Sequence, residues 1–251
     1  MTSDAMIVDV SRDWVIACGV QQRFMQTTER PRALDALDYS ARCRQLQALG
    51  GDCYDFARRE DGMLALTVGD ASGKGLAAAL MIANVQSSLR TASEFAGDDL
   101  VRVFSAVSRQ VYASSHADRY ATVFHALYDP AARTLRYVNA GHNPPMIIRR
   151  SGSVISLYDG GAPVGLFPNS SYEEGFVQLK SGDLVVAYTD GVIEAENPAG
   201  DDWGTKGLRK AAIQFAAESA EEIVSGIFES MDEFSHGQQT DDATVLVLRV
   251  P

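Results

Sequence analysis

The sequence is short of cysteine and of long apolar runs. Its 251 residues include only three cysteines, Cys18, Cys43 and Cys53, an odd number without a Cys-x-x-Cys pair. This count excludes a disulfide framework or a zinc knuckle and predicts reduced thiols. No apolar run approaches the roughly 18 residues that a membrane-spanning helix needs, and residues 1–12 are too polar for a secretory signal. We therefore expect a cytoplasmic protein that does not associate with membranes.

Basic residues are also in the minority. Asp and Glu number 33 against 22 Lys and Arg, which gives a formal net charge of -11, and no basic run with interleaved aromatic residues occurs. These features argue against a nucleic-acid partner. The acidity has two readings, either plain solubility or an acidic metal site that contributes to the excess.

The N-terminal region has the pattern of a single helix. Apolar residues recur at a spacing of three and four and predict one stripe on a helix that ends before Pro31, formed by Trp14, Ala17, Cys18, Gln21, Phe24 and Met25. We expect residues 1–36 to be a helical segment that packs on the core or, alternatively, pairs with a partner by dimerisation or regulator docking. Residues 37–251 are expected to form one domain.

Predicted helices and strands follow one another in blocks. Strand-like runs lie at residues 63–68, 121–128, 134–139, 146–149, 184–188 and 243–250, and helical patterns at 75–91, 100–112 and 207–234. The pattern at 37–50 is ambiguous. Because the blocks do not alternate as in a doubly wound fold, the sequence predicts an α+β protein with antiparallel sheets and segregated helices.

The segment GDASGKGLAAAL, residues 69–80, has glycines and a lysine but is not a phosphate-binding P-loop. That loop requires four residues between its glycines and a hydroxyl after the lysine. Here three residues separate Gly69 from Gly73, Lys74 is followed by Gly75, and Asp70 would repel a phosphate.

Aspartates stand at the ends of several predicted strands. They are Asp70 after 63–68, Asp190 after 184–188, and Asp241 with Asp242 before 243–250, while GGDCYD at 50–55 adds Asp52 and Asp55. If the last strand runs antiparallel to the first two, these carboxylates converge at one edge of the sheet, where they would suit Mg²⁺ or Mn²⁺. Taken singly, each is also an ordinary turn residue.

Six segments in this order resemble the metal-dependent protein phosphatases of the protein phosphatase 2C-like (PPM) family, and within it the bacterial SpoIIE/RsbU branch. They are GGDCYD, GDASGKGLAAAL, RYAT, NAGHNPP, YTDGVIEAEN and TDDATVLVLR. The resemblance implies an antiparallel β-sandwich of two sheets flanked by helices, in α-β-β-α layers, with two metal ions at one end.

The resemblance also implies a ligand set for two divalent ions, Mn²⁺ or Mg²⁺. Asp70 would bridge both ions, the carbonyl of Ala71 would complete the second, and Asp190 and Asp241 would bind from the other strand ends. Further candidates are Asp52, Asp242 and, through a water, Asp55. Asp70, Asp190 and Asp241 would act in catalysis through the water that the ions activate.

The implied reaction is hydrolysis of phosphoserine or phosphothreonine on a regulatory protein, typically a STAS-domain anti-sigma-factor antagonist. Gly73 and Gly75 would allow the tight loop that presents Asp70, and Lys74 is expected to be solvated. Eukaryotic relatives carry a histidine after the metal-bridging Asp-Gly, and this chain lacks it. His142 is either its substitute as proton donor or a turn residue that holds backbone groups.

Three alternatives remain open at the level of the sequence. The first is a phosphatase fold that binds and sequesters a partner, against which the three aspartates argue. The second is a metal-dependent phosphoesterase for small molecules, which would use the same metal site. The third is a cysteine phosphatase, but Asp52 and Asp55 should raise the pKa of Cys53, no glycine-rich loop separates it from Arg58 and Arg59, and strand alternation directs it into the core.

Overall fold

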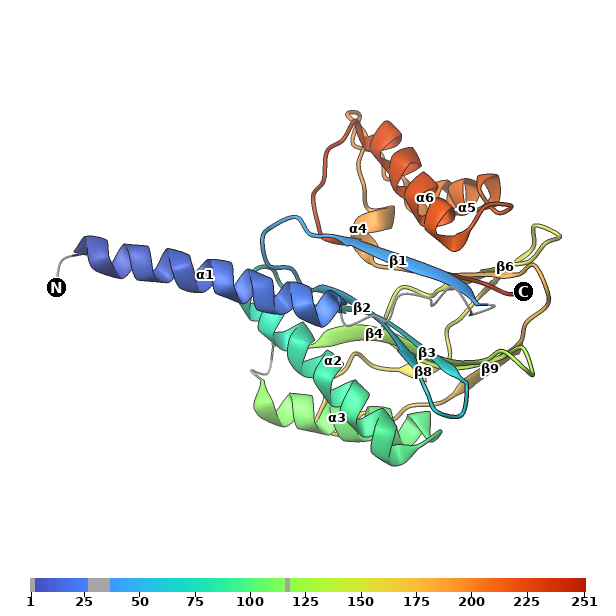
Figure 1. Ribbon diagram of the computed structural model, residues 1–251, viewed down its shortest axis with the longest axis horizontal. Coiled ribbons are helices and arrows are strands. Elements are labelled where there is room, and N and C mark those ends of the chain that lie inside the picture. The colour runs from blue at the N-terminus through green and yellow to red at the C-terminus, as the bar shows by residue number, and fades with distance from the viewer. Residues whose placement is uncertain (1–2, 27–36, 116–117) are drawn as a thin grey trace.

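Two stacked β-sheets with helices on both outer faces form the body of the protein (Figure 1). The computed structural model describes residues 3–26, 37–115 and 118–251. The α+β class and the α-β-β-α layers predicted from the sequence are confirmed.

The first sheet has five strands in the order β1-β11-β10-β6-β7, and every neighbouring pair in it is antiparallel. Its strands are β1 (Asp38–Arg44), β6 (Met146–Ile148), β7 (Val154–Ser156), β10 (Leu184–Tyr188) and β11 (Ala243–Arg249). Because β11 lies between two strands and is covered on both faces, its sequence is apolar almost throughout.

The second sheet has six strands. β2 (Asp52–Arg58), β3 (Leu64–Ala71), β4 (Ala121–Asp129), β5 (Thr134–Ala140) and β8 (Gly160–Gly161) are neighbours in this order, and β9 (Gly175–Gln178) pairs with β5. The pairings in this sheet are antiparallel except that the two-residue strand β8 runs parallel to β5. β2 is the edge strand at one end of this sheet.

Side chains of β2 and β3 alternate between two cores. Phe56, Leu66 and Val68 face the first sheet and fill the space between the sheets. Cys53 and Ala65 point the other way, toward the helices. This alternation follows from the two-residue period of a strand and places Asp52 and Asp70 on the face toward the first sheet.

Helices cover the outer face of each sheet (Figure 1). α2 (Leu76–Ala96) and α3 (Leu100–Ser114) pack on the second sheet, and α4 (Asp190–Ile193), α5 (Gly204–Gln214) and α6 (Ala220–Ser235) lie over the first. α6 begins with a capping box, in which the Ser219 hydroxyl accepts from the Glu222 amide while the Glu222 carboxylate accepts from the Ser219 amide. In the part of the chain that the structure describes, no helix is long and apolar enough to cross a membrane.

The N-terminal helix α1 (Ser3–Gln26) extends beyond the sandwich (Figure 1). Its predicted packing on the core is confirmed only for one part of the stripe, where Ala17 and Cys18 are half-buried and Gln21 is buried. Trp14 and Phe24 of the same stripe are more than a third exposed. The side chain of Met25 and the segment 27–36 lie outside the described residues.

The longer predicted elements are found within a few residues of their expected ends. The helical pattern at 207–234 is divided into α5 and α6, and the ambiguous segment at 37–50 contains β1. The strand-like runs did not include β2, β7, β8 or β9, and the single turn α4 was not predicted either.

Candidate active site

Two of the predicted aspartates face each other across neighbouring strands. Asp52, the first residue of β2, is the cross-strand partner of Asp70 near the end of β3. Asp52 is 1% exposed, whereas Asp70 is partly exposed. Both therefore lie at the same end of the second sheet.

Asp52 connects this end of the second sheet to the first. Its Oδ2 accepts a hydrogen bond of 2.7 Å from Thr189 Oγ1 and another of 2.7 Å from Thr244 Oγ1. Thr189 directly follows β10, and Thr244 is the second residue of β11. Asp52 thus has one oxygen occupied by structural contacts, and Oδ1 remains as its potential ligand atom.

Asp190 and Asp241 approach from the first sheet. β10 and β11 are antiparallel, so the end of one lies beside the start of the other, and the Thr189 amide donates to the Thr244 carbonyl (3.1 Å). Asp190 begins α4, and Asp241 precedes β11. The expectation that these two and Asp70 meet at one sheet edge needs correction, because Asp70 belongs to the other sheet and the site spans the sandwich.

The carboxylates repel one another. Burial, followed by the charges of Asp190, Asp241 and Asp242, raises the pKa of Asp70 to about 7. Burial and Asp241 likewise raise the pKa of Asp190. An excess of negative charge of this kind favours a cation between the side chains.

Two oxygen atoms from one strand share the space beside Gly51. A Cβ atom at Gly51 would lie 3.0 Å from the Ala71 carbonyl oxygen and 3.4 Å from Asp70 Oδ1. The Ala71 carbonyl, predicted as a ligand, and the Asp70 carboxylate, predicted to bridge the two ions, therefore border the same space. An added side chain at Gly51 would crowd that space.

Lys74 lies beside these carboxylates. Its Nζ is 2.8 Å from Asp241 Oδ2 and donates to the Thr240 carbonyl (3.0 Å), and its side chain is about half exposed. The half-exposed side chain agrees with the expected solvated lysine, but the ammonium in addition pairs with one of the proposed metal ligands.

Arg119, from the segment RYAT, was missed as a functional candidate. Its Nη1 donates to the Ser72 carbonyl (3.0 Å), two residues after Asp70. Gly73 has φ +92°, and a Cβ there would come within 2.3 Å of Arg119 Nη1. The glycine therefore allows the guanidinium to lie against the loop, and the arginine in RYAT was the signal that could have identified it.

Asp242 and Asp55 have other partners. Asp242 accepts from the amides of Leu46 (2.7 Å) and Gly51 (2.8 Å), so both of its oxygens hold the loop before β2. Asp55 points to the opposite face of the second sheet and pairs with Arg90 at 2.5 Å. The structure does not bring Asp55 together with the other carboxylates.

His142 is a buried structural residue in this fold. Its amide donates to Asn139 Oδ1 (2.7 Å), and its Nδ1 is 2.9 Å from the hydroxyl of Thr122, the cross-strand neighbour of Asp70. Burial lowers the pKa of His142 to about 4. The ring is neutral at pH 7, which favours the turn-residue alternative over the proton donor.

The carboxylates of the described residues are not arranged as a complete set of metal ligands. Within the described ranges, no group of three or more His, Cys, Asp or Glu side chains has the arrangement of a metal site. The donor set nevertheless fits a hard divalent cation in its chemistry, because it consists of carboxylate and carbonyl oxygens with excess negative charge.

Comparison with known proteins supports this interpretation of the fold. The family model described as Stage II sporulation protein E (SpoIIE) matches residues 60–251. The phosphoserine phosphatase RsbU of Bacillus subtilis (strain 168) is 27% identical over 242 residues, which cover 96% of this chain and 71% of RsbU.

Solved structures show the same architecture. The SiaA-PP2C domain of Pseudomonas aeruginosa superposes with a TM-score of 0.82 at 19% identity, with both chains covered to 100%. RsbX, solved in complex with magnesium, gives a TM-score of 0.60 at 17% identity over 86% of this chain and 97% of that one. The fold is therefore that of the PP2C phosphatase domains. With most of its length matched, the chain belongs to the SpoIIE family and is a protein serine/threonine phosphatase by that membership.

Proposed function

We propose that this protein hydrolyses phosphoserine or phosphothreonine on a regulatory protein, namely a STAS-domain anti-sigma-factor antagonist, and that it needs two divalent cations, Mn²⁺ or Mg²⁺. The observation that carries the proposal is that Asp70 from one sheet lies close enough to Asp190 and Asp241 from the other for their charges to raise its pKa. Similarity to RsbU, a phosphoserine phosphatase, supports the substrate class.

The cations would be held by Asp70, the Ala71 carbonyl, Asp190 and Asp241, with Asp52 as a further ligand. When bound, they supply Lewis acidity that lowers the pKa of a water molecule and neutralises phosphate charge. Lys74 occupies Asp241 Oδ2, so its ion pair competes with a cation for that oxygen. Asp52, held by two threonine hydroxyls, keeps the ends of the two sheets in register for the other ligands.

Arg119 would help to hold the phosphate of the substrate. Arg119 uses one N–H for the Ser72 carbonyl, and its other donors can bind a phosphate oxygen. The structure also has a cavity of about 880 Å³, but it is lined by Asp55 and Arg90 and lies on the face of the second sheet opposite to Asp70. Specificity must then come from contacts beyond the phosphate, which a folded protein substrate offers.

Helix α1 is the proposed docking element for a regulator or a second copy of the chain. Val15, Ile16 and Val20 on this helix are at least half exposed. The helix also contacts the loop that precedes Asp52, because Gln21 Nε2 donates to the Gly50 carbonyl (2.6 Å).

The test is phosphate release from a panel of phosphorylated STAS-domain proteins, with Mn²⁺, with Mg²⁺ and with a chelator. We expect cation-dependent release and loss of turnover by orders of magnitude in Asp70→Asn and Asp190→Asn, since each removes a ligand but no core packing. Glu229→Gln, an exposed change on α6, is the matched control and should keep full activity. Faster hydrolysis of nucleotides than of every protein substrate would favour a small-molecule phosphoesterase. Binding without turnover would favour a sequestering module.

A further inference from the structure

The segment NAGH at the end of β5 forms a tight turn that fixes the position of one histidine ring. The His142 amide donates to Asn139 Oδ1 (2.7 Å), which closes the turn. Gly141 has φ +67°, and a Cβ atom there would lie 2.5 Å from Pro163 Cγ, so the turn requires glycine. The His142 ring is thereby placed against β4, the strand next to β5.

Thr122 on β4 connects this ring to the carboxylate site. It is the direct cross-strand partner of Asp70, so the two side chains lie on the same face of the second sheet with their Cβ atoms roughly 5 Å apart. Its Oγ1 is 2.9 Å from His142 Nδ1. Thr122 is partly exposed, whereas His142 is buried. The hydroxyl therefore stands between a buried ring and the space beside Asp70.

The surroundings of the ring favour one direction for the hydrogen bond between His142 and Thr122. Nε2 is buried and completes no hydrogen bond within the described ranges. Burial lowers the pKa of His142 to about 4, and the backbone carbonyl of Tyr188 opposes this lowering, as an acceptor that faces a ring N–H does. A neutral ring with its N–H at Nε2 leaves Nδ1 to accept the proton of the Thr122 hydroxyl.

A hydroxyl that gives its proton to His142 has only lone pairs to offer on the side of Asp70. Asp70 and Thr122 make no hydrogen bond to each other through their side chains in the described structure, although they are direct neighbours. An ionised Asp70 has no proton to donate, whereas a water molecule has two. The Thr122 oxygen is thus suited to accept from a water molecule beside Asp70.

We propose that Thr122 is a catalytic residue that binds the attacking water and that His142 is the positioning residue that orients it. Thr122 Oγ1 accepts one hydrogen bond from a water molecule beside Asp70, so that a lone pair of this water is directed to the phosphate. This role rests on the proposed phosphatase function. It gives the segments RYAT and NAGH a joint task, because one supplies the hydroxyl and the other holds it.

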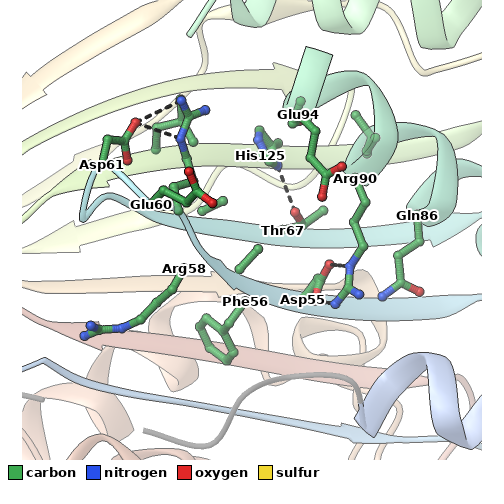
Figure 2. Close-up of a pocket in the computed structure, with 16 residues that line it drawn as sticks. Asp55, Phe56, Arg58, Glu60, Asp61, Thr67, Gln86, Arg90, Glu94 and His125 are labelled. Carbon is green, nitrogen blue, oxygen red and sulfur yellow. Dashed lines mark hydrogen bonds and ion pairs between the residues drawn. The ribbon is translucent and has the colours of Figure 1, made fainter. Parts of the chain in front are cut away.

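A second threonine–histidine pair in the same sheet provides a matched control. Thr67 Oγ1 is 2.8 Å from His125 Nδ1, and burial lowers the pKa of His125 to about 4 as well. Thr67 is three residues before Asp70 on β3, so its side chain faces the other side of the sheet. Figure 2 shows this pair on the face that carries α2. Loss of either hydroxyl removes a similar hydrogen bond, but only Thr122 adjoins the carboxylates.

Hydrolysis of p-nitrophenyl phosphate with Mg²⁺ tests the role of the hydroxyl, because this ester needs the attacking water but no docked protein. In Thr122→Val, which keeps the shape of the side chain, we expect kcat to fall about tenfold and KM to change less than about twofold, since the water loses one hydrogen bond. Thr122→Ser should recover most of the activity, and Thr67→Val should turn over normally. Full activity in Thr122→Val, or an equal loss in Thr67→Val, would overturn the proposed roles.

The ring-nitrogen resonances of ¹⁵N-histidine-labelled protein decide the matter independently of turnover. In the metal-free protein we expect the His142 N–H at Nε2 and a shift of the Nδ1 resonance in Thr122→Val, which removes its donor. Addition of Mg²⁺ should shift this resonance saturably in the native protein, because a water that donates to Thr122 strengthens the next hydrogen bond. An N–H at Nδ1, or a His142 resonance insensitive to Thr122→Val or to bound Mg²⁺, would overturn the proposed roles.

The two levels of the proposal fail differently. Native protein that hydrolysed neither p-nitrophenyl phosphate nor any phosphorylated protein would contradict the phosphatase function itself. Normal turnover in Thr122→Val would contradict only the role of the hydroxyl.

Discussion

Lys74 is the positive group that the structure places directly on the acidic site. Its ammonium contacts Asp241 and, through its charge, opposes the rise in the pKa of Asp70. A divalent cation at Asp241 would have to displace this contact. The half-exposed position of Lys74 keeps the contact weak, as for other solvent-accessible ion pairs.

Replacing Lys74 should therefore strengthen cation binding. In Lys74→Ala we expect the dissociation constant for Mn²⁺ to fall by about 1.5- to 5-fold, the range that corresponds to an exposed ion pair. Calorimetric titration of the substrate-free protein measures it. Lys210→Ala, an exposed lysine on α5, should leave the constant unchanged. Weaker Mn²⁺ binding in Lys74→Ala would mean that the lysine organises the ligands instead of competing for them.

Cys53 is placed where a nucleophile would not work. It is 2% exposed among apolar side chains, and burial, then Asp55 and Asp52, raise the pKa of its thiol well above the usual range. We expect Cys53→Ser to keep most of the cation-dependent turnover and to lose about 1–3 kcal/mol of unfolding free energy, because a hydroxyl is buried there.

Turnover and urea unfolding of Cys53→Ser should be measured beside Cys18→Ser, in which the half-buried thiol of α1 is changed. Iodoacetamide should have little effect on turnover of the native protein. Complete loss of activity in Cys53→Ser, with the variant folded and loaded with metal, would contradict hydrolysis by metal-activated water.

At the residue scale, the sequence predicts single aspartates better than their partners. Asp70, Asp190 and Asp241 stand out because each lies at a strand end. The separation of Asp52 from Asp55 was also predictable, since residues three apart on a strand face opposite sides. Thr189 and Thr244 were not predictable as partners of Asp52, because a threonine within two residues of an aspartate is common in sequences, and the contact forms only when the sheets stack.

At the element scale, one buried glutamine attaches α1 to the domain. Gln21 Oε1 accepts from the Gly50 amide (3.2 Å) while Nε2 donates to the Gly50 carbonyl (2.6 Å). The next residue, Gly51, donates its amide to Asp242. The position of α1 is thereby connected to the loop that leads into Asp52.

Gln21→Ala should loosen that loop. We expect hydrogen exchange of the Gly50 and Gly51 amides to accelerate by about tenfold, because a hydrogen-bonded amide pair is lost. Gln22→Ala, the exposed neighbour on the same helix, provides the control. Mass spectrometry of the peptide that spans residues 45–51 measures the exchange. Equal exchange rates in Gln21→Ala and Gln22→Ala would show that α1 does not hold the loop.

Periodicity identified the long elements and missed the short ones. α2 and α3 have apolar residues at helical spacing over several turns, and β10 and β11 are continuous apolar runs. β8 and α4 span two and four residues, too few for either period to be visible. β1 alternates buried and exposed residues only partly, which explains why its segment was ambiguous.

At the scale of the whole molecule, the site depends on how the two sheets stack. The sequence does not determine which strands are neighbours in a sheet. The expectation that the last strand, β11, shares a sheet with both β3 and β10 is correct for β10 and wrong for β3, which belongs to the other sheet. The carboxylates nevertheless converge, because the ends of β3 and β10 and the start of β11 lie at the same end of the sandwich. Asp52, between the sheets, bonds to both Thr189 and Thr244 and makes that arrangement specific.

His125, one of two buried neutral histidines in the described fold, should affect the stability of the whole molecule. Its pKa is about 4 in the folded protein, against 6.5 for the ordinary value that applies to the unfolded chain. Between these values the unfolded chain takes up a proton and the folded protein does not. The stabilisation is therefore complete above pH 6.5 and declines toward pH 4, by about 1.4 kcal/mol per pH unit.

Asp70 contributes in the opposite direction over part of this range, because its pKa is raised in the folded state, so the total slope is not diagnostic. The difference between native protein and His125→Gln is diagnostic, since the carboxylates are common to both. In chelator-containing buffer, urea unfolding from pH 6.5 to 4.5 should show a loss of stability in the native protein that exceeds the loss in the variant by about 1.4 kcal/mol per pH unit. His236→Gln, at the exposed end of α6, should follow the native curve. Parallel curves for the native protein and His125→Gln would mean that His125 gains its proton in the folded state as readily as in the unfolded chain.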